Sequence, residues 1–197
     1  MIDPAFPDTV FAAQSTFRAV LDALARPGEI KPVRAPIQVP LPLTPAMAAI
    51  AQTLLDQDTP IWLDAPLAAS PDVGAWLRFH TGAPIVRAPG ECAFAFVREQ
   101  MRLPPLDTFN QGTPEYPDRS TTLIVHVDGW NSGPALTFAG PGIKRQQRLT
   151  AGPLPADMAR RLSANRALFP CGVDLLLVAE DSVAALPRSI RPFIQED

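Results

Sequence analysis

Proline constrains this chain more than any other residue type. Of its 197 residues, 24 are proline, and a proline fits neither the interior of an α-helix nor a central strand. Four prolines between positions 32 and 42 therefore exclude a helix from residues 29–43, which we expect to form a covering loop or an irregular sheet edge. Residues 103–118 are a second proline-rich connection. The regular elements must lie between these segments.

Two of the prolines mark the beginnings of helices. A threonine or serine followed directly by proline, at residues 44–45 and 70–71, supplies an N-cap and a first-turn proline. We expect one helix to run from there to about residue 56, and the other to stop at Gly82.

Apolar residues spaced three and four apart predict two further helices. In the first, over residues 10–26, the expected inward stripe is Phe17, Val20, Leu21 and Leu24. The second covers residues 155–166, with Met158, Leu162 and Asn165 facing inward.

Short apolar or alternating runs predict strands, at residues 61–63, 85–87, 92–97, 120–127, 135–140, 145–150 and 172–179. Residues 172–179 are the most hydrophobic and are the candidate for the sheet centre. The turn sequence DGWNSGP predicts that residues 120–127 and 135–140 pair as an antiparallel hairpin. We therefore expect one α/β domain over residues 1–197, a three-layer α/β/α sandwich on a mixed sheet.

The charge balance and the N-terminal sequence exclude several classes of function. A net charge of -3 argues against nucleic acid as a partner. The N-terminus, MIDPAFPDTV, lacks the basic and then apolar pattern of a secretory signal, and no run approaches the roughly 20 apolar residues of a membrane span. We expect a cytoplasmic protein that does not contact a membrane.

Few residues are available for cofactor or metal chemistry. Cys92 and Cys171 lie far apart and form no metal-binding motif, so two ordinary buried thiols are favoured over a disulfide or a metal site. An iron-sulfur cluster needs three or four cysteines, which this chain cannot supply alone. Lys31 and Lys144 are its two lysines, and neither sequence context suits a Schiff base. We expect no cofactor and no bound metal.

Six segments in the same order resemble the PhnH family of carbon-phosphorus lyase subunits. They are FRAVLDALARPG, LLDQDTPIWL, STTLIV, LTFAGPGI, NRALFPCGVDLLLV and ALPRS, and together they span nearly the whole chain. Two departures from the family pattern are small. DQDT replaces a D-x-E-T string, and Cys171 replaces an aliphatic residue or arginine, which argues against a chemical role at that position.

The resemblance implies a fold similar to pyridoxal-phosphate-dependent transferases, but without the cofactor. It implies a subunit that works with PhnG, PhnI, PhnJ and PhnL and forms a homodimer when isolated. These proteins form a ribose 1-phosphonate 5-triphosphate from ATP and an alkylphosphonate, before PhnJ cleaves the carbon-phosphorus bond. We expect a subunit without catalytic residues of its own. The alternative is a phosphonate- or nucleotide-binding subunit that contributes residues to an active site.

Residues 139–145, here called the glycine turn, are one candidate binding element. Gly140 and Gly142 could present backbone N–H groups, and Lys144 and Arg145 two cations, to a phosphate. The spacing fits neither a Walker loop nor a dinucleotide fingerprint, so a tight structural turn is the other interpretation.

Charged residues at helix ends and turns form the second candidate element. If a ligand cleft exists, we expect it to contain Arg18, Arg26, Asp56, Arg166 and Arg188. The other interpretations are a solvated helix stripe of Arg18, Asp22 and Arg26, and structural anchoring at the turns.

The remaining polar residues have structural interpretations. His80 and His126 are expected in the core, without a carboxylate at triad spacing. A magnesium site at residues 56–58 and Asp64 competes with a capped helix end. Residues 103–109 and 192–194 are apolar segments that either contact another subunit or pack on their own domain.

Overall fold

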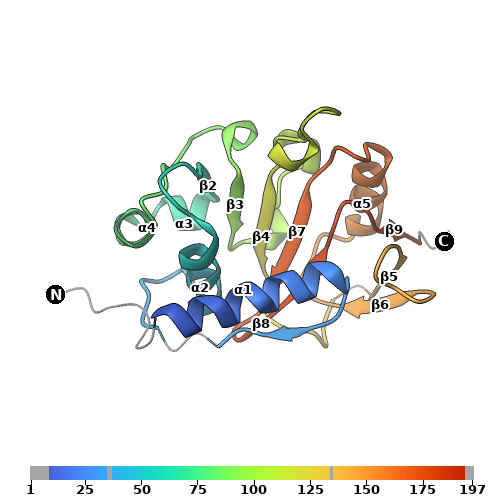
Figure 1. Cartoon of the computed structure of the whole chain (residues 1–197), viewed down its shortest axis with the longest axis horizontal. Helices are drawn as coiled ribbons and strands as arrows, with labels where there is room; N and C mark the ends of the chain where they lie inside the picture. Colours follow the sequence, from blue (N-terminus) through green and yellow to red (C-terminus); the bar gives the residue numbers. More distant parts are fainter. Residues whose placement is uncertain (1–8, 35–36, 134, 194–197) are drawn as a thin grey trace.

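The computed structural model describes residues 9–34, 37–133 and 135–193. Its main sheet has six strands in the order β1-β8-β7-β4-β3-β2 (Figure 1). Their bounds are β1 Lys31–Pro32, β2 Ile61–Leu63, β3 Phe94–Val97, β4 Thr122–His126, β7 Asp174–Val178 and β8 Ser182–Leu186. The strands β2, β3, β4 and β7 are mutually parallel, and β8 is antiparallel to both β7 and β1. The predicted α/β class with a mixed sheet is confirmed.

The centre of this sheet is formed by β4 and β7. Leu175 and Leu177 point to one hydrophobic cluster, and Leu176 and Val178 to the other, so β7 is covered on both faces. In β4, Leu123 and Val125 face one cluster in the same way, and Ile124 faces the other. The prediction that residues 172–179 lie at the sheet centre is confirmed.

Helices α1 (Thr9–Ala25), α2 (Pro45–Leu54) and α4 (Pro71–Thr81), with the short α3 (Ala65–Ala68), pack around one of these clusters. Thr44 caps α2 by accepting a hydrogen bond from the Met47 N–H at 3.4 Å, whereas Ser70 makes no side-chain cap bond to α4. Gly82 ends α4 in the left-handed conformation, with φ of 73°. The three predicted helices in this half of the chain are confirmed.

The inward face of α1 differs from the prediction. Phe17 and Leu21 are 46% and 49% exposed, whereas Ala19, Val20 and Ala23 are buried. Small side chains let the helix lie close to β8, with which it packs around the same cluster. The segment after α1 continues this contact, since the Gly28 N–H bonds the Ala185 carbonyl at 3.0 Å.

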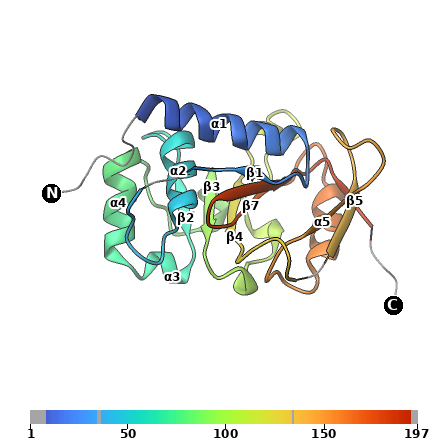
Figure 2. The same ribbon diagram turned by 90° about the horizontal axis from the view of Figure 1, so that it is seen from below.

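The other face of the main sheet carries α5 (Met158–Ala167) and a second sheet, in the order β6-β5-β9. These strands are β5 Ala135–Ala139, β6 Gln147–Thr150 and β9 Arg191–Pro192. Figures 1 and 2 show α5 and β5 together at the end of the molecule opposite to α4. The predicted inward residues of α5, namely Met158, Leu162 and Asn165, are all buried.

The predicted hairpin between residues 120–127 and 135–140 is wrong. Because β4 pairs with β3 on one side and with β7 on the other, it has no free edge for β5. The turn instead passes the chain to the second sheet, where β5 lies between β6 and β9.

Two further segments differ from expectation, and a third fits one of its two interpretations. Residues 85–87 form no strand, and only Ile85 makes an isolated bridge to Ile61. The fully buried strand β8 has no counterpart among the predicted strands. The segment 103–109 packs on its own chain, because Leu103, Leu106 and Phe109 are buried; Phe193 is exposed, and residue 194 lies outside the described residues.

Candidate functional site

The glycine turn lies against the end of α1. A Cβ atom on Gly142, whose φ is 80°, would overlap the Ala25 carbonyl oxygen, and a Cβ on Gly140 would stand 3.2 Å from the Ile190 Cα. The turn closes on itself, since the Ile143 N–H donates to the Gly140 carbonyl at 3.2 Å. Close packing therefore accounts for both glycines.

Two of the predicted cations lie near this turn. Arg26 follows α1 and pairs with Asp22 at 3.2 Å, with both side chains about half exposed. Lys144 is exposed and takes part in none of the salt bridges found among the described residues. Lys144 and Arg145 of the glycine turn, both exposed, and Arg26 beside it are therefore the cations available to an anion here.

Arg188 is held by its own chain. Its Nε lies 3.2 Å from each oxygen of Asp174, Nη2 lies 2.5 Å from Asp174 Oδ2, and Nη1 donates to the Pro117 carbonyl at 2.5 Å. Arg166 lies over the ring of Phe169, 4.4 Å from its centroid. Both arginines thus brace the segment that follows α5.

Arg18 and Asp56 lie elsewhere. Arg18 is exposed on α1. Asp56 follows α2, which packs in a different hydrophobic cluster from α5. Its Oδ1 accepts the Thr59 hydroxyl at 2.5 Å and the Asp58 N–H at 3.0 Å, and these bonds lower the pKa of Asp56. The structure does not gather the eight predicted residues around one cleft.

A different group of polar side chains lies at the carboxyl ends of the parallel strands, where α/β sheets commonly bind ligands. Asp64, directly after β2, is buried and accepts the N–H groups of Arg98 and Glu99 at 2.7 and 2.8 Å and that of Leu67 at 3.3 Å. Burial raises the pKa of Asp64, and the three N–H groups oppose that rise. Asp64 therefore fastens β2 to β3 and caps α3. No group of three or more His, Cys, Asp or Glu that could hold a metal occurs within residues 9–34, 37–133 and 135–193.

His126 ends β4 and lines a hollow of about 330 Å³ together with Thr44, Asp128 and Glu180. Its Nε2 lies 3.4 Å from Asp128 Oδ1, a partner two residues along that the sequence reading overlooked. Burial lowers the pKa of His126, and the nearby Arg98 cation lowers it further. The imidazole is therefore neutral at neutral pH.

We expect the His126 burial to make stability depend on pH. Below about pH 6.5 the unfolded chain takes up a proton that the folded imidazole resists, so the free energy of unfolding falls as the pH drops. A His126→Gln variant should lose less stability between pH 7 and pH 5 than wild type, in urea unfolding at both values. His80→Gln is the comparison variant. Burial lowers the pKa of His80 too, so each variant should remove only the part of the pH dependence that comes from its own histidine.

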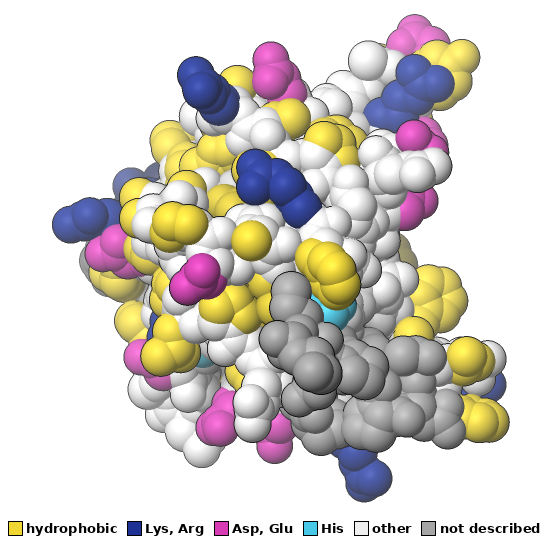
Figure 3. Space-filling view, turned by 90° about the vertical axis from the view of Figure 1, so that its left-hand side faces the viewer, with side chains coloured by type: hydrophobic (Ala, Val, Ile, Leu, Met, Phe, Trp, Pro, Cys, Tyr) yellow, Lys and Arg dark blue, Asp and Glu magenta, His cyan; other side chains and the backbone are white. Residues whose placement is uncertain are grey.

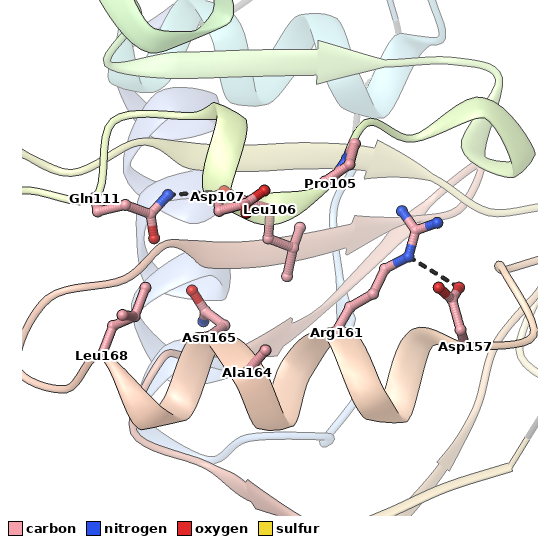
Figure 4. Close-up of a pocket in the computed structure, with 9 residues that line it drawn as sticks. All are labelled: Pro105, Leu106, Asp107, Gln111, Asp157, Arg161, Ala164, Asn165 and Leu168. Atoms are coloured by element: carbon pink, nitrogen blue, oxygen red, sulfur yellow. Dashed lines mark hydrogen bonds and ion pairs between the residues drawn. The ribbon is translucent and has the colours of Figure 1, made fainter.

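A groove of about 350 Å³ lies between α5 and residues 105–111 (Figure 4). Leu106, Ala164 and Leu168 form apolar walls, and Asp107, Gln111, Asp157 and Arg161 add polar groups. The groove and the hollow beside His126 lie on different elements, and the groove contains none of the eight predicted residues.

A family model described as bacterial phosphonate metabolism protein (PhnH) matches residues 4–192 of the chain. The chain belongs to the PhnH family. The PhnH subunit of alpha-D-ribose 1-methylphosphonate 5-triphosphate synthase from Rhizobium meliloti (strain 1021) is 44% identical over 187 residues, 95% of this chain and 93% of the relative. The putative C-P lyase subunit protein HtxG of Stutzerimonas stutzeri is 37% identical over 78 residues, 40% of each chain. The resemblance carried by the six sequence segments is confirmed.

Sequence reasoning missed the groove of this PhnH-family chain for a definable reason. Gln111 lies in the proline-rich connection, and Asp157 and Arg161 lie on the predicted helix 155–166, so only the tertiary fold brings them together. The Asp157 and Arg161 spacing of four residues was the one available signal, since it is typical of a helical ion pair.

Proposed function

We propose that this chain is an accessory subunit, without catalytic residues of its own, of an enzyme that makes alpha-D-ribose 1-methylphosphonate 5-triphosphate during phosphonate catabolism. The observation that carries the proposal is the 44% identity, over 95% of the chain, to a relative of that name. PhnG, PhnI, PhnJ and PhnL are the proposed partners, in the cytoplasm, with a homodimer as the isolated form.

The placement of the polar side chains supports a scaffolding role. Arg188 and Asp64 bond to their own chain, as does Asn165, whose amide bonds both backbone groups of Val173. Side chains fixed in this way stabilise the fold, which is what a scaffolding subunit requires.

The proposed ancestry is a transferase fold that has lost pyridoxal phosphate. Lys31 lies on the edge strand β1 and bonds Glu29 at 2.7 Å, and Lys144 is exposed in the glycine turn. A Schiff-base lysine needs a secluded pocket in which its amine has no counter-ion. Neither position offers one, which supports a subunit that works without the cofactor.

A ligand-binding subunit is the second candidate function, favoured by the hollow at the carboxyl ends of the parallel strands with neutral His126 in its wall. The anion site at the glycine turn, with Arg26 and Lys144, belongs to the same candidate. Calorimetry of the isolated protein with methylphosphonate and with Mg-ATP distinguishes the candidates. Micromolar binding would favour this second function over a scaffold.

Exposed apolar side chains give an assembly subunit surfaces to bury. Val10 and Phe11 on α1 and Phe79 on α4 are each more than 60% exposed. Figure 3 shows the end of the molecule that carries α4, where apolar side chains spread over the surface and the charged ones stand apart from one another. A surface rich in apolar side chains and poor in charged ones is typical of the centre of a subunit interface.

We expect the tagged chain to retain PhnG, PhnI and PhnJ through affinity purification and gel filtration. Synthase activity with ATP and methylphosphonate should fall to background when this subunit is omitted, and the chain alone should show none. A chain that elutes alone in the presence of those partners, or a full rate without it, would contradict the proposal.

A further inference from the structure

The groove beside α5 contains a hydrogen-bond acceptor that its own chain leaves unused. The Gln111 Nε2 donates to the carbonyls of Leu106 and Phe109, each at 2.7 Å, and these two bonds fix which way the side-chain amide faces. The opposite atom, Oε1, is buried and has no partner among the described residues. Figure 4 shows it directed toward α5. A buried acceptor of this kind favours an incoming donor.

Negative charge exceeds positive charge in the groove. Arg161 Nε bonds Asp157 at 2.9 Å, and its Nη1 donates to the carbonyls of Leu103 and Pro104 at 2.8 and 3.4 Å. Asp107 is exposed and makes none of the salt bridges within the described part of the chain. The two carboxylates therefore outnumber the one guanidinium, whose Nε and Nη1 already have partners.

The walls of the groove are apolar. Leu106 lies beside Gln111 and points toward α5, Ala164 lies on α5, and Leu168 directly follows that helix (Figure 4). Leu168 is 45% exposed in the structure, so part of this wall has no cover. A suitable occupant has an aliphatic stem for these walls and a donor-rich, positively charged end.

We propose that the groove binds an arginine side chain of a partner subunit. Its guanidinium would donate to Gln111 Oε1 and pair with Asp107, and its stem would pack on Leu106 and Leu168. Arginine suits the site because its planar fork serves two acceptors at once, and its weak hydration lowers the cost of entering a partly apolar groove. This inference rests on the proposed function, because it needs a partner subunit.

Two substitutions test the groove in the assembly. Asp107→Lys reverses the free charge, and Ala164→Phe fills the groove from α5. Each should weaken capture of PhnG, PhnI and PhnJ by about tenfold or more. Asp58→Lys is the matched charge control, since Asp58 follows α2, does not line the groove, and uses only its backbone N–H in its turn. Thermal unfolding of each variant shows whether it is folded.

A probe on the isolated chain tests the chemistry of the occupant. Butylguanidinium should shift the NMR amide signals of Gln111, Ala164 and Leu168, whereas the neutral isostere butylurea should not. The Ala164→Phe variant should remove the response. Equal responses to both compounds, or none to either, would overturn the cation site.

The assembly and guanidinium experiments distinguish a failure of arginine docking in the groove from a failure of the proposed subunit role. If wild type assembles and both groove variants assemble equally well, the docking inference is wrong and the subunit role stands. If wild type does not assemble, the proposed function fails first, and the arginine occupant fails with it. A guanidinium response without assembly would identify a site for a free cation and overturn the partner side chain.

Discussion

Replacing Asp174 with alanine should lower the free energy of unfolding by about 3 kcal/mol or more. The Asp174 and Arg188 side chains are only 19% and 14% exposed, and the carboxylate accepts bonds from the guanidinium and, at 2.7 Å, from the Arg188 backbone N–H. Without it, the cation stays partly buried with only the carbonyls of Pro117 and Pro170 as partners. Urea unfolding of wild type and variant measures the loss.

Asp118→Ala is the control for this substitution, because it removes an exposed carboxylate one residue from Pro117. It should change stability by less than about 0.5 kcal/mol. A double variant, Asp174→Ala with Arg188→Met, should recover part of the loss, since no charge is then left unpaired. A loss at Asp174 as small as that at Asp118 would contradict the anchoring role of Arg188.

The anchoring role of Arg188 limits its use as a position for testing ligand binding. Reversing the charge of Arg188 should destabilise the fold, so a loss of phosphonate or nucleotide binding there says nothing about contact with a ligand unless the variant is folded. Reversing the charge of Arg26 has no such complication, because its ion pair with Asp22 is exposed and contributes little. Arg26 is therefore the cleaner position at which to test the glycine turn.

Asn165→Leu should cost about 2 to 4 kcal/mol of stability. Asn165 is 4% exposed, and its amide donates to the Val173 carbonyl at 2.9 Å and accepts the Val173 N–H at 2.8 Å. Leucine has a similar size and offers neither group, so a buried donor and a buried acceptor lose their partners together. Chemical denaturation gives the size of the loss.

Hydrogen exchange adds a local measurement to that prediction. The Val173 amide should exchange faster in the Asn165→Leu variant, while the amides of β2, at the other side of the sheet, keep their relative protection. Ser163→Ala on the same helix is the control and should leave both unchanged. Unaltered protection of Val173 would show that the amide bridge does not hold this turn.

The elements that the sequence predicted well are those specified by local signals. Thr44 and Pro45 mark the start of α2, Gly82 terminates α4, and the apolar run of β7 belongs at a sheet centre. Pairing is not local. The DGWNSGP turn has the composition of a hairpin, but β4 already has a parallel neighbour on each side, so the tertiary arrangement excluded β5.

The site was less predictable than the fold, because its chemistry depends on contacts between distant residues. His126 and Arg98 end neighbouring strands, and the parallel order that brings them to one edge cannot be read from either segment. Gln111 carries no motif, and its importance lies in the orientation imposed by two backbone carbonyls. The arginines at turns were recognisable as anchors, but their partners, such as Asp174, were not.

The packing of α1 and β1 on β8 has a consequence for synthesis of the chain. Both elements precede β8 by most of the sequence, and the hydrogen bond from Gly28 to Ala185 joins the same two regions. During translation α1 can pack on α2 early, but its contact with β8 must wait until residues 182–186 leave the ribosome. A chain interrupted before residue 182 therefore cannot complete this side of its core.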